Sequence, residues 1–393
     1  MRDKYFDHSA TTYVRPEVVE IMQEYYSEKY GNPGSFHYKG LEANEALNSA
    51  REKFADIIGS KSDEIIFTGG GTESCNLAIK GVARSLKKQG KHIITSTIEH
   101  HAVMDTCDYL ERHEDYEVTY VDVNKDGIID PESVRKAIRP DTILISIMYA
   151  NNEIGTIQPI KKIAKIAKEN DVLIHTDACQ AIGALDINVQ DLGVDMMTLN
   201  ASKIYGPKGV GMLYLRKGVR IVPLIHGGGQ ERNLRSGTEN VPGIIGFTKA
   251  VELAQEEKTE ESKRLIKLRD YLIKRVTDEV PECWLNGHPE KRLPNNVNIT
   301  FLNVEGEAII LLLNEYKVYV SSGSACTSKT LDPSHVIVSM GLPYEAAHGS
   351  IRFTLGKINT KKDIDDMMEV LPPIIKKLRG ISPVHLKASE VIK

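Results

Sequence analysis

A lysine at the end of an expected strand is the first residue of this chain that indicates a chemical function. Lys203 lies in TLNASKIYGPKGVG (residues 198–211), between a short apolar run and a turn made of glycine and proline. Ligands of open α/β sheets bind outside the carboxyl ends of the strands, so this position faces the expected site. A lysine amine there can form a Schiff base with an aldehyde. The residues that follow the other apolar runs are therefore expected to share a site with this lysine.

Polar side chains follow three other apolar runs. His100 comes after KHIITST, Asn151 and Asn152 come after TILISIMYA, and Asp177 comes after VLIHT with Gln180 just beyond it. Taken singly, a histidine or an asparagine at the end of a strand more often has a structural role. Together they place an imidazole, amides and a carboxylate on the same edge of the sheet as the lysine amine.

A glycine-rich turn supplies an anion site. The run EIIFT is followed by GGGTES, where Gly71 allows a tight turn and Thr72 opens a helix. The N–H groups and the dipole at a helix N-terminus favour phosphate, and the Gly-Lys-Ser/Thr of a Walker loop is missing. Pyridoxal phosphate needs a lysine, a carboxylate that keeps its pyridine nitrogen protonated, and a phosphate site. Lys203, Asp177 and GGGT provide these three parts, so the residues predict this cofactor.

A metal ion is the alternative ligand for the same edge. His175 and Asp177 are two residues apart on an expected strand, so their side chains point the same way. No third ligand stands at a matching spacing, and Lys203 would repel a cation nearby. We therefore expect no metal site.

The C-terminal part of the chain adds two candidate residues. Cys326 lies in VSSGSACTSKTLDP, a stretch of small and polar residues that favours an exposed and reactive thiol. Arg352 lies in the apolar run SIRFTLG, which would hold its guanidinium firmly enough to bind a carboxylate through two parallel bonds. Either residue could instead be structural.

The elements that must position these residues follow from the hydrophobic pattern. Between about residues 64 and 216, seven short apolar runs alternate with amphipathic helical stretches, including 73–88, 131–138 and 160–170. This alternation predicts a mainly parallel sheet with helices on both faces. From about residue 259 a long charged helix and several short strands indicate a smaller α+β domain.

Composition excludes several classes of protein. The 393 residues are 41% hydrophobic and 26% charged, with a formal net charge of −4, which is typical of a globular protein without a general basic surface for nucleic acid. No apolar leader begins the chain, and IILLL is too short to cross a bilayer, so we expect a cytoplasmic protein with no membrane partner. Five scattered cysteines without a C-x-x-C pair suggest neither disulfides nor zinc.

Ordered motifs along nearly the whole chain resemble one family. They are YFDHSATT, YGNPGSFH, FTGGGTESCNLAIKG, NNEIGTIQPI, HTDACQAIG, KIYGPKGVG, HGGGQERNLRSGT, SSGSACTS and GSIRFTLG. In order and spacing they are similar to the cysteine desulfurases of the class V aminotransferase family. The motif SSGSACTS resembles the long-loop branch that supplies sulfur for iron–sulfur cluster assembly and related thiolation.

This resemblance implies the fold and the reaction. It implies a fold-type I pyridoxal phosphate enzyme, with a large cofactor-binding domain of residues 16–258 around a seven-stranded sheet. Residues 1–15 and 259–393 would form the small domain that carries the Cys326 loop. The enzyme would be a homodimer that converts L-cysteine to L-alanine, leaves persulfide sulfur on Cys326, and passes it to an iron–sulfur scaffold protein or another acceptor.

The resemblance also implies roles for the residues collected above. Lys203 would form the Schiff base and move protons, Asp177 would pair with the pyridine nitrogen, and His100 would stack on the ring and take part in acid–base steps. Arg352 and Asn152 would bind substrate, and Cys326 would attack its sulfur. The remaining cofactor contacts would come from Gly71, Thr72, Asn152, Gln180, Asn200, Ser202 and, from the neighbouring subunit, Thr238.

The chain departs from the family pattern at four positions. Ser202 stands where histidine precedes the lysine in the family, and Asn200 stands where serine is usual. His8 replaces a common asparagine in a segment that lines the family's substrate pocket, and Cys75 replaces an acidic residue. The alternatives are a selenocysteine lyase or an aminotransferase, which would not need Cys326, and a cofactor-poor scaffold protein.

Overall fold

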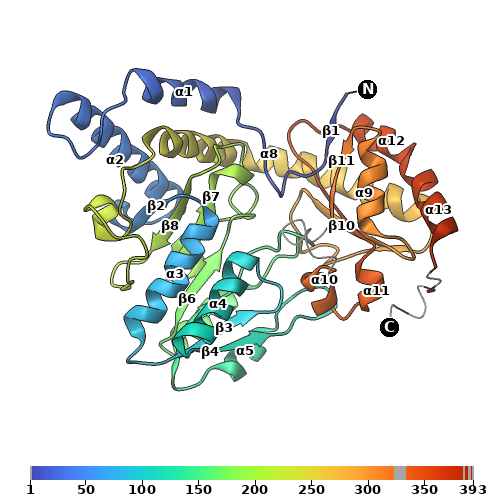
Figure 1. Ribbon diagram of the computed structural model, residues 1–393, viewed down its shortest axis with the longest axis horizontal. Coiled ribbons are helices and arrows are strands. Elements are labelled where there is room, and N and C mark those ends of the chain that lie inside the picture. The colour runs from blue at the N-terminus through green and yellow to red at the C-terminus, as the bar shows by residue number, and fades with distance from the viewer. Residues whose placement is uncertain (1, 323–332, 384–385, 388–390, 392–393) are drawn as a thin grey trace.

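The larger part of the molecule is built on a seven-stranded sheet (Figure 1). The computed structural model describes residues 2–322, 333–383, 386–387 and 391. Across the sheet the strands run in the order β2 (Ile65–Thr68), β8 (Gly211–Leu215), β7 (Met196–Asn200), β6 (Leu173–Asp177), β5 (Thr142–Ser146), β3 (His92–Ser96) and β4 (Glu117–Val121). Only β8 runs against its neighbours among these strands. The mainly parallel seven-stranded sheet expected from the sequence is therefore confirmed.

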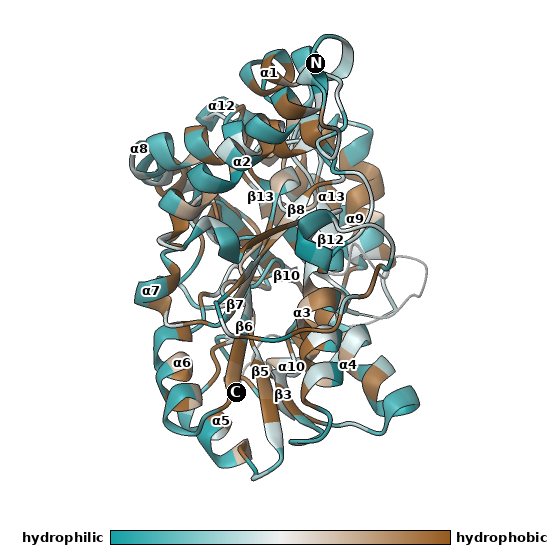
Figure 2. Ribbon diagram, turned by 90° about the vertical axis from the view of Figure 1, so that its left-hand side faces the viewer, coloured by the Kyte–Doolittle hydropathy of each residue, from teal (hydrophilic) through white to brown (hydrophobic). Residues whose placement is uncertain are grey.

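Helices cover both faces of this sheet, because its strands are apolar on both sides. Ile65 packs into one hydrophobic cluster and the next residue, Ile66, into another on the opposite face. The first face carries α1 (Pro16–Ser27), α2 (Tyr38–Ile58), α5 (Pro131–Ala137), α6 (Ile160–Glu169) and α7 (Val189–Leu192); the second carries α3 (Gly71–Leu86) and α4 (His101–Glu114). Figure 2 shows the apolar strands β5 and β6 inside and hydrophilic surfaces on α5, α6 and α7.

A single long helix, α8 (Val241–Glu279), connects the two parts of the molecule (Figure 1). It begins well before the charged stretch that predicted it, because the Asn240 side chain accepts a hydrogen bond from the Gly243 N–H and a proline follows at the first turn. Phe247 belongs to the core of the larger part, whereas Leu272 belongs to the second core. The predicted domain boundary at residues 258/259 falls inside this helix and stays a prediction.

The second part contains a small antiparallel sheet. Its strands are β12 (Ser321–Ser322), β13 (Ser350–Thr354), β10 (Asn296–Phe301) and β9 (Cys283–Leu285), and a parallel pair joins β1 (Lys4–Tyr5) to β11 (Val318–Tyr319). The helices here are α9 (Gly306–Asn314), α10 (His335–Ser339), α11 (Tyr344–Ala347), α12 (Lys361–Met368) and α13 (Leu371–Ile381). Short 3-10 turns are η1 (Ser62–Glu64), η2 (Ala201–Lys203) and η3 (Gln230–Asn233). Within the described ranges, every helix is too short or too polar to span a lipid bilayer.

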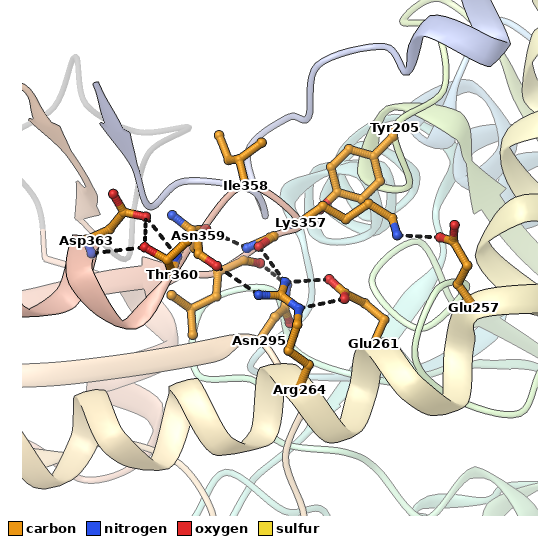
Figure 3. A network of polar contacts seen from close by, with 12 residues as sticks. Tyr205, Glu257, Glu261, Arg264, Asn295, Lys357, Ile358, Asn359, Thr360 and Asp363 are labelled. Atoms are coloured by element: carbon orange, nitrogen blue, oxygen red, sulfur yellow. Dashed lines mark hydrogen bonds and ion pairs between the residues drawn. The ribbon is translucent and has the colours of Figure 1, made fainter. Parts of the chain in front are cut away.

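Polar contacts fix the turn after β13 against α8 (Figure 3). Arg264 of α8 donates hydrogen bonds to the carbonyl oxygens of Asn359, at 2.8 Å, and Gly356, at 2.9 Å. The Lys357 ammonium of the same turn forms an ion pair with Glu257, also on α8. This turn follows the strand that carries Arg352, so α8 fixes the position of one wall of the site described next.

Candidate active site

A cavity of about 350 Å³ lies at the carboxyl ends of the parallel strands. Its size is that of a typical small-molecule site. Nine of the residues predicted from the sequence line it: Gly71, Thr72, His100, Asn152, Asp177, Gln180, Asn200, Lys203 and Arg352. The structure thus brings together residues as far apart in the sequence as Gly71 and Arg352.

Lys203 reaches the cavity because the chain forms a 3-10 turn directly after β7. Asn200 ends the strand, and its side-chain oxygen accepts hydrogen bonds from the N–H of Ser202, at 2.8 Å, and from the Ser202 hydroxyl, at 3.0 Å. This cap starts the 3-10 turn η2, whose last residue is the lysine. The lysine Nζ donates a hydrogen bond to the carbonyl oxygen of Ala10 at 2.6 Å. An amine held at the cavity wall in this way is available to a carbonyl carbon bound there.

Asp177 is the last residue of β6, and its carboxylate is fixed from two sides. One oxygen accepts a hydrogen bond from the Cys179 N–H at 3.0 Å, and the other lies 3.8 Å from the Cys75 sulfur. The residue is largely buried, yet it lines the cavity. Cys75 therefore packs against the carboxylate as a structural residue. A buried carboxylate at this point can keep a ring nitrogen protonated.

His100 caps the N-terminus of α4. Its Nδ1 accepts a hydrogen bond from the Ala102 N–H at 3.0 Å, so a neutral ring carries its proton on Nε2. Burial lowers the pKa of His100 and the nearby Lys203 charge lowers it further, while Asp177 acts in the opposite direction. At neutral pH the ring is therefore neutral and can either donate from Nε2 or pack flat against an aromatic ligand.

The N-terminus of α3 forms the anion end of the site. A Cβ on Gly71 would lie 2.9 Å from the Cys179 sulfur and 3.3 Å from Asn200 Nδ2, so the close packing there requires glycine. An adjoining hollow is lined by Thr72, Asn200, Ser202 and Lys208. Helix N–H groups, hydroxyls, an amide and an ammonium are the donors that a phosphate needs. With the amine of Lys203 and the Asp177 carboxylate, this set fits pyridoxal phosphate.

Arg352 closes the opposite end of the cavity. Its Nη2 donates a hydrogen bond to the Asp7 carboxylate at 2.8 Å, and its Nη1 donates one to the Asn152 carbonyl oxygen at 3.1 Å. Its Nε is buried without a hydrogen-bond partner among the described residues. The guanidinium is thus oriented in advance, which favours recognition of a carboxylate.

Two of the predicted residues that the structure describes are not part of the cavity wall. Ser202 lines the adjoining hollow rather than the cavity itself. Thr238 is exposed on the loop after η3. Cys326 lies outside the described residues. No three histidine, cysteine or acidic side chains in the described part of the chain are arranged to bind a metal ion.

The structure adds residues that the sequence reasoning did not assign. Ser9, Ala10, Cys179, Glu153 and His335 also line the cavity. Glu153 directly follows two predicted asparagines, so its position could have suggested it. The contribution of Ala10 is a backbone carbonyl, which no side-chain pattern reveals. His335 stands alone in the sequence and carried no signal.

Two buried glutamates lie at or behind the cavity wall. Burial raises the pKa of Glu153 to about 7, although a hydrogen bond from the Ser334 hydroxyl at 2.5 Å and the Arg352 charge act against this. Burial raises the pKa of Glu99 to about 8. Glu99 accepts hydrogen bonds from the Ser96 hydroxyl and the Met148 N–H. Both carboxyl groups therefore hold a proton at a higher pH than an exposed glutamate does.

His8 lies behind the cavity rather than in its wall. Its ring packs 4.9 Å from the Tyr5 ring and 6.0 Å from the Tyr205 ring, measured between centroids. Burial lowers the pKa of His8 to about 4, so the ring is neutral at neutral pH. The neighbouring Ser9 and Ala10 provide the contacts of this segment with the cavity.

Comparison with known proteins agrees with this geometry. The family model described as aminotransferase class-V matches residues 4–367. A relative from Dictyoglomus turgidum named cysteine desulfurase IscS is 56% identical over 382 residues, which cover 97% of each chain. Similar solved structures include a NifS-like protein, with a TM-score of 0.90 and 42% sequence identity, which covers 96% of this chain and 100% of its own. Another is SspA in complex with cysteine, with a TM-score of 0.80 and 39% identity, which covers 90% of this chain and 98% of its own.

Proposed function

The chain belongs to the class V aminotransferase family and is a pyridoxal phosphate-dependent cysteine desulfurase, and from this premise we propose that Cys326 carries the sulfur onward. In the overall reaction the C–S bond of L-cysteine breaks and an S–S bond forms at the Cys326 thiol. The products are L-alanine and a Cys326 persulfide, so atoms and electrons balance without an added oxidant.

One observation carries the assignment of the site: an amine, a carboxylate, a helix N-terminus and an arginine surround a single cavity. When bound, the cofactor supplies a reactive carbonyl carbon and an electron sink. Asp177 holds positive charge at the ring nitrogen, and Thr72 and the α3 N-terminus bind phosphate. Arg352 binds the substrate carboxylate, and Lys203 Nζ takes and returns protons beside it.

The other cysteines are poor candidates for the sulfur acceptor. Burial raises the pKa of each thiol that the structure describes, namely Cys75, Cys107, Cys179 and Cys283. A thiolate is the nucleophilic form, so these thiols are weakly reactive even though Cys179 lines the cavity. This supports Cys326, which lies in a stretch of small polar residues, as the attacking thiol.

The same proposal includes a homodimer that works in the cytoplasm. Exposed aromatic side chains lie at the start of α2, with Phe36 97% and Tyr38 76% exposed, and such residues are enriched at interfaces. Thr238, exposed in one protomer, would reach the phosphate of its partner. The sulfur would pass from Cys326 to an iron–sulfur scaffold protein or a related acceptor.

Mass spectrometry of the holoenzyme after incubation with L-cysteine tests the sulfur carrier. We expect an added sulfur atom on the Cys326 peptide, and loss of alanine formation in Cys326→Ala. The matched control is Cys179→Ala, which removes a thiol from the cavity and should leave the persulfide on Cys326. Undiminished alanine formation in Cys326→Ala would contradict the role of Cys326 and favour a selenocysteine lyase, whereas formation of the 2-oxo acid in place of alanine would favour an aminotransferase. A colourless protein that gains no pyridoxal phosphate would favour the scaffold alternative.

A further inference from the structure

The N-terminal strap, defined here as residues Asp7–Thr12, touches both ends of the site. At one end Asp7 contacts Arg352, and at the other end Ala10 contacts Lys203. Asp7 and Ala10 are three positions apart, and an extended chain spans at most roughly 3.6 Å per residue. A short covalent segment therefore ties the expected carboxylate-binding group to the expected Schiff-base lysine.

The contact at the first end is a nearly buried ion pair. Asp7 Oδ1 accepts a hydrogen bond from Arg352 Nη2 at 2.8 Å, with the arginine side chain 3% exposed and the aspartate side chain 20% exposed. The strap is also fixed to the same strand by a hydrogen bond from the Ser9 N–H to Thr354 Oγ1 at 2.9 Å. A long arginine side chain has many rotamers, so a fixed carboxylate beside it selects one of them.

The second end of the strap is fixed to the turn that carries the lysine. Thr12 donates from its N–H, at 2.9 Å, and its hydroxyl, at 3.0 Å, to the carbonyl oxygen of Ser202. The Thr12 Oγ1 accepts a hydrogen bond from the Tyr205 N–H at 2.8 Å. Between the two ends, Gln180 Nε2 donates to the Ser9 carbonyl oxygen at 3.0 Å. The strap therefore has partners on both sides of the cavity.

We propose that Asp7 is a positioning residue for L-cysteine, which acts by holding the Arg352 guanidinium at the distance from Lys203 that the substrate requires. This proposal rests on the proposed role of Arg352. Two electrostatic effects oppose each other here, since a carboxylate beside the arginine also repels the substrate carboxylate. The orienting effect dominates, because without Asp7 the buried guanidinium would lose its ion-pair partner and be held only by the hydrogen bond to the Asn152 carbonyl oxygen.

Steady-state kinetics of the holoenzyme with two substrates tests this inference. In Asp7→Ala we expect the KM for L-cysteine to rise about tenfold, the size of effect that loss of a charge-assisted hydrogen bond gives, with kcat changed less than about twofold. L-cysteinamide has the thiol and the amine but no carboxylate, so its KM should be the same in both proteins. Asp7→Asn retains an acceptor oxygen and should recover part of the loss.

Two control variants separate the possible failures. Asp3→Ala removes an exposed carboxylate of the same N-terminal segment, 3.8 Å from Lys317, and should change neither KM. Arg352→Ala should raise the KM for L-cysteine alone; if it does not, the proposed role of Arg352 is wrong and the inference about Asp7 falls with it. If Arg352→Ala behaves as expected while Asp7→Ala lowers the KM, leaves it unchanged, or affects both substrates equally, only the inference about Asp7 is overturned.

Discussion

The phenolic oxygen of Tyr205 accepts a hydrogen bond from the backbone N–H of Lys357 at 2.8 Å (Figure 3). Tyr205 follows the lysine of the active site by two residues, and Lys357 follows Arg352 by five. Tyr205 has a φ of 65°, in the left-handed region that side chains other than glycine seldom adopt. The bond thus links the turn that carries the amine to the turn that follows the strand of Arg352.

Tyr205→Phe should lower the free energy of unfolding by about 1–3 kcal/mol, because the Lys357 N–H loses its acceptor while the ring packing remains. Denaturation of the holoenzyme in urea measures this change. Tyr13→Phe is the matched control, since the Tyr13 ring lies 5.1 Å from the Tyr205 ring but is 40% exposed. Equal effects of the two variants would contradict a specific contribution from the Tyr205 hydroxyl.

A buried ion pair between Arg51 and Glu231 should be important for stability. Both oxygens of Glu231 accept from the guanidinium at 2.8 Å, and one also accepts from the Phe67 N–H at 3.0 Å. Glu231→Ala would leave a buried arginine charge without its partner, so we expect a loss of about 3–5 kcal/mol in unfolding free energy. The exposed pair of Lys274 and Asp278 is the control, and Asp278→Ala should lower the unfolding free energy far less than Glu231→Ala does.

The stability of the protein should depend on pH through Glu99. Its folded-state pKa of about 8 lies above the ordinary value of 4.5, so between these values the folded state retains a proton that the unfolded state releases. The contribution of Glu99 to the unfolding free energy is therefore fully present below pH 4.5 and is lost as the pH rises through about 8. Glu99→Gln cannot titrate. Its stability relative to the wild type should increase with pH by up to about 1.4 kcal/mol per unit.

Urea denaturation of Glu99→Gln and wild type at pH 5, 6.5 and 8 checks this expectation. The other titrating groups are the same in both proteins, so their contributions cancel when the unfolding free energy of the wild type is subtracted from that of Glu99→Gln. A difference that stays constant over this range would show that the folded carboxyl group has an ordinary pKa.

Gly356 should not tolerate a side chain. A Cβ at this position would lie 2.4 Å from the His8 ring, so Gly356→Ala should lower the unfolding free energy by about 1–3 kcal/mol. Removing the ring should relieve the clash, and the double variant with His8→Ala should be more stable than the sum of the single changes predicts. Gly380, in α13, has nothing within 4 Å of its added Cβ, and Gly380→Ala should be neutral or stabilising. Thermal unfolding of the wild type and of the four variants, including the single variant His8→Ala, measures these differences.

The sequence was informative where local chemistry decides structure. Apolar, β-branched runs form strands because both faces of a parallel sheet are buried, and all seven runs between residues 64 and 216 are strands of one sheet. The carboxyl ends of parallel strands meet at one edge, so Asp177, His100 and Lys203 could be assigned to one cavity before the structure was known. The motifs around these residues were enough to indicate the family.

Contacts between distant segments were not predictable in this way. The start of α8 at Val241 depends on a cap at Asn240 in a stretch without a strong helical pattern. The partner of Arg352 is Asp7, 345 residues away in the sequence, and the acceptor of Lys203 is a backbone carbonyl 193 residues away. No periodicity or spacing encodes such a pair, because it forms only when separate elements pack.

The sequence alone therefore determined the class of chemistry, since residue types at strand ends fix which functional groups can meet at the edge of the sheet. Tertiary structure alone decided how those groups are held: the strap between Arg352 and Lys203, the neutral state of His100 and the raised pKa values of Glu99 and Glu153. The physical reason is that orientation and desolvation depend on every neighbour in space, whereas functional groups belong to single residues.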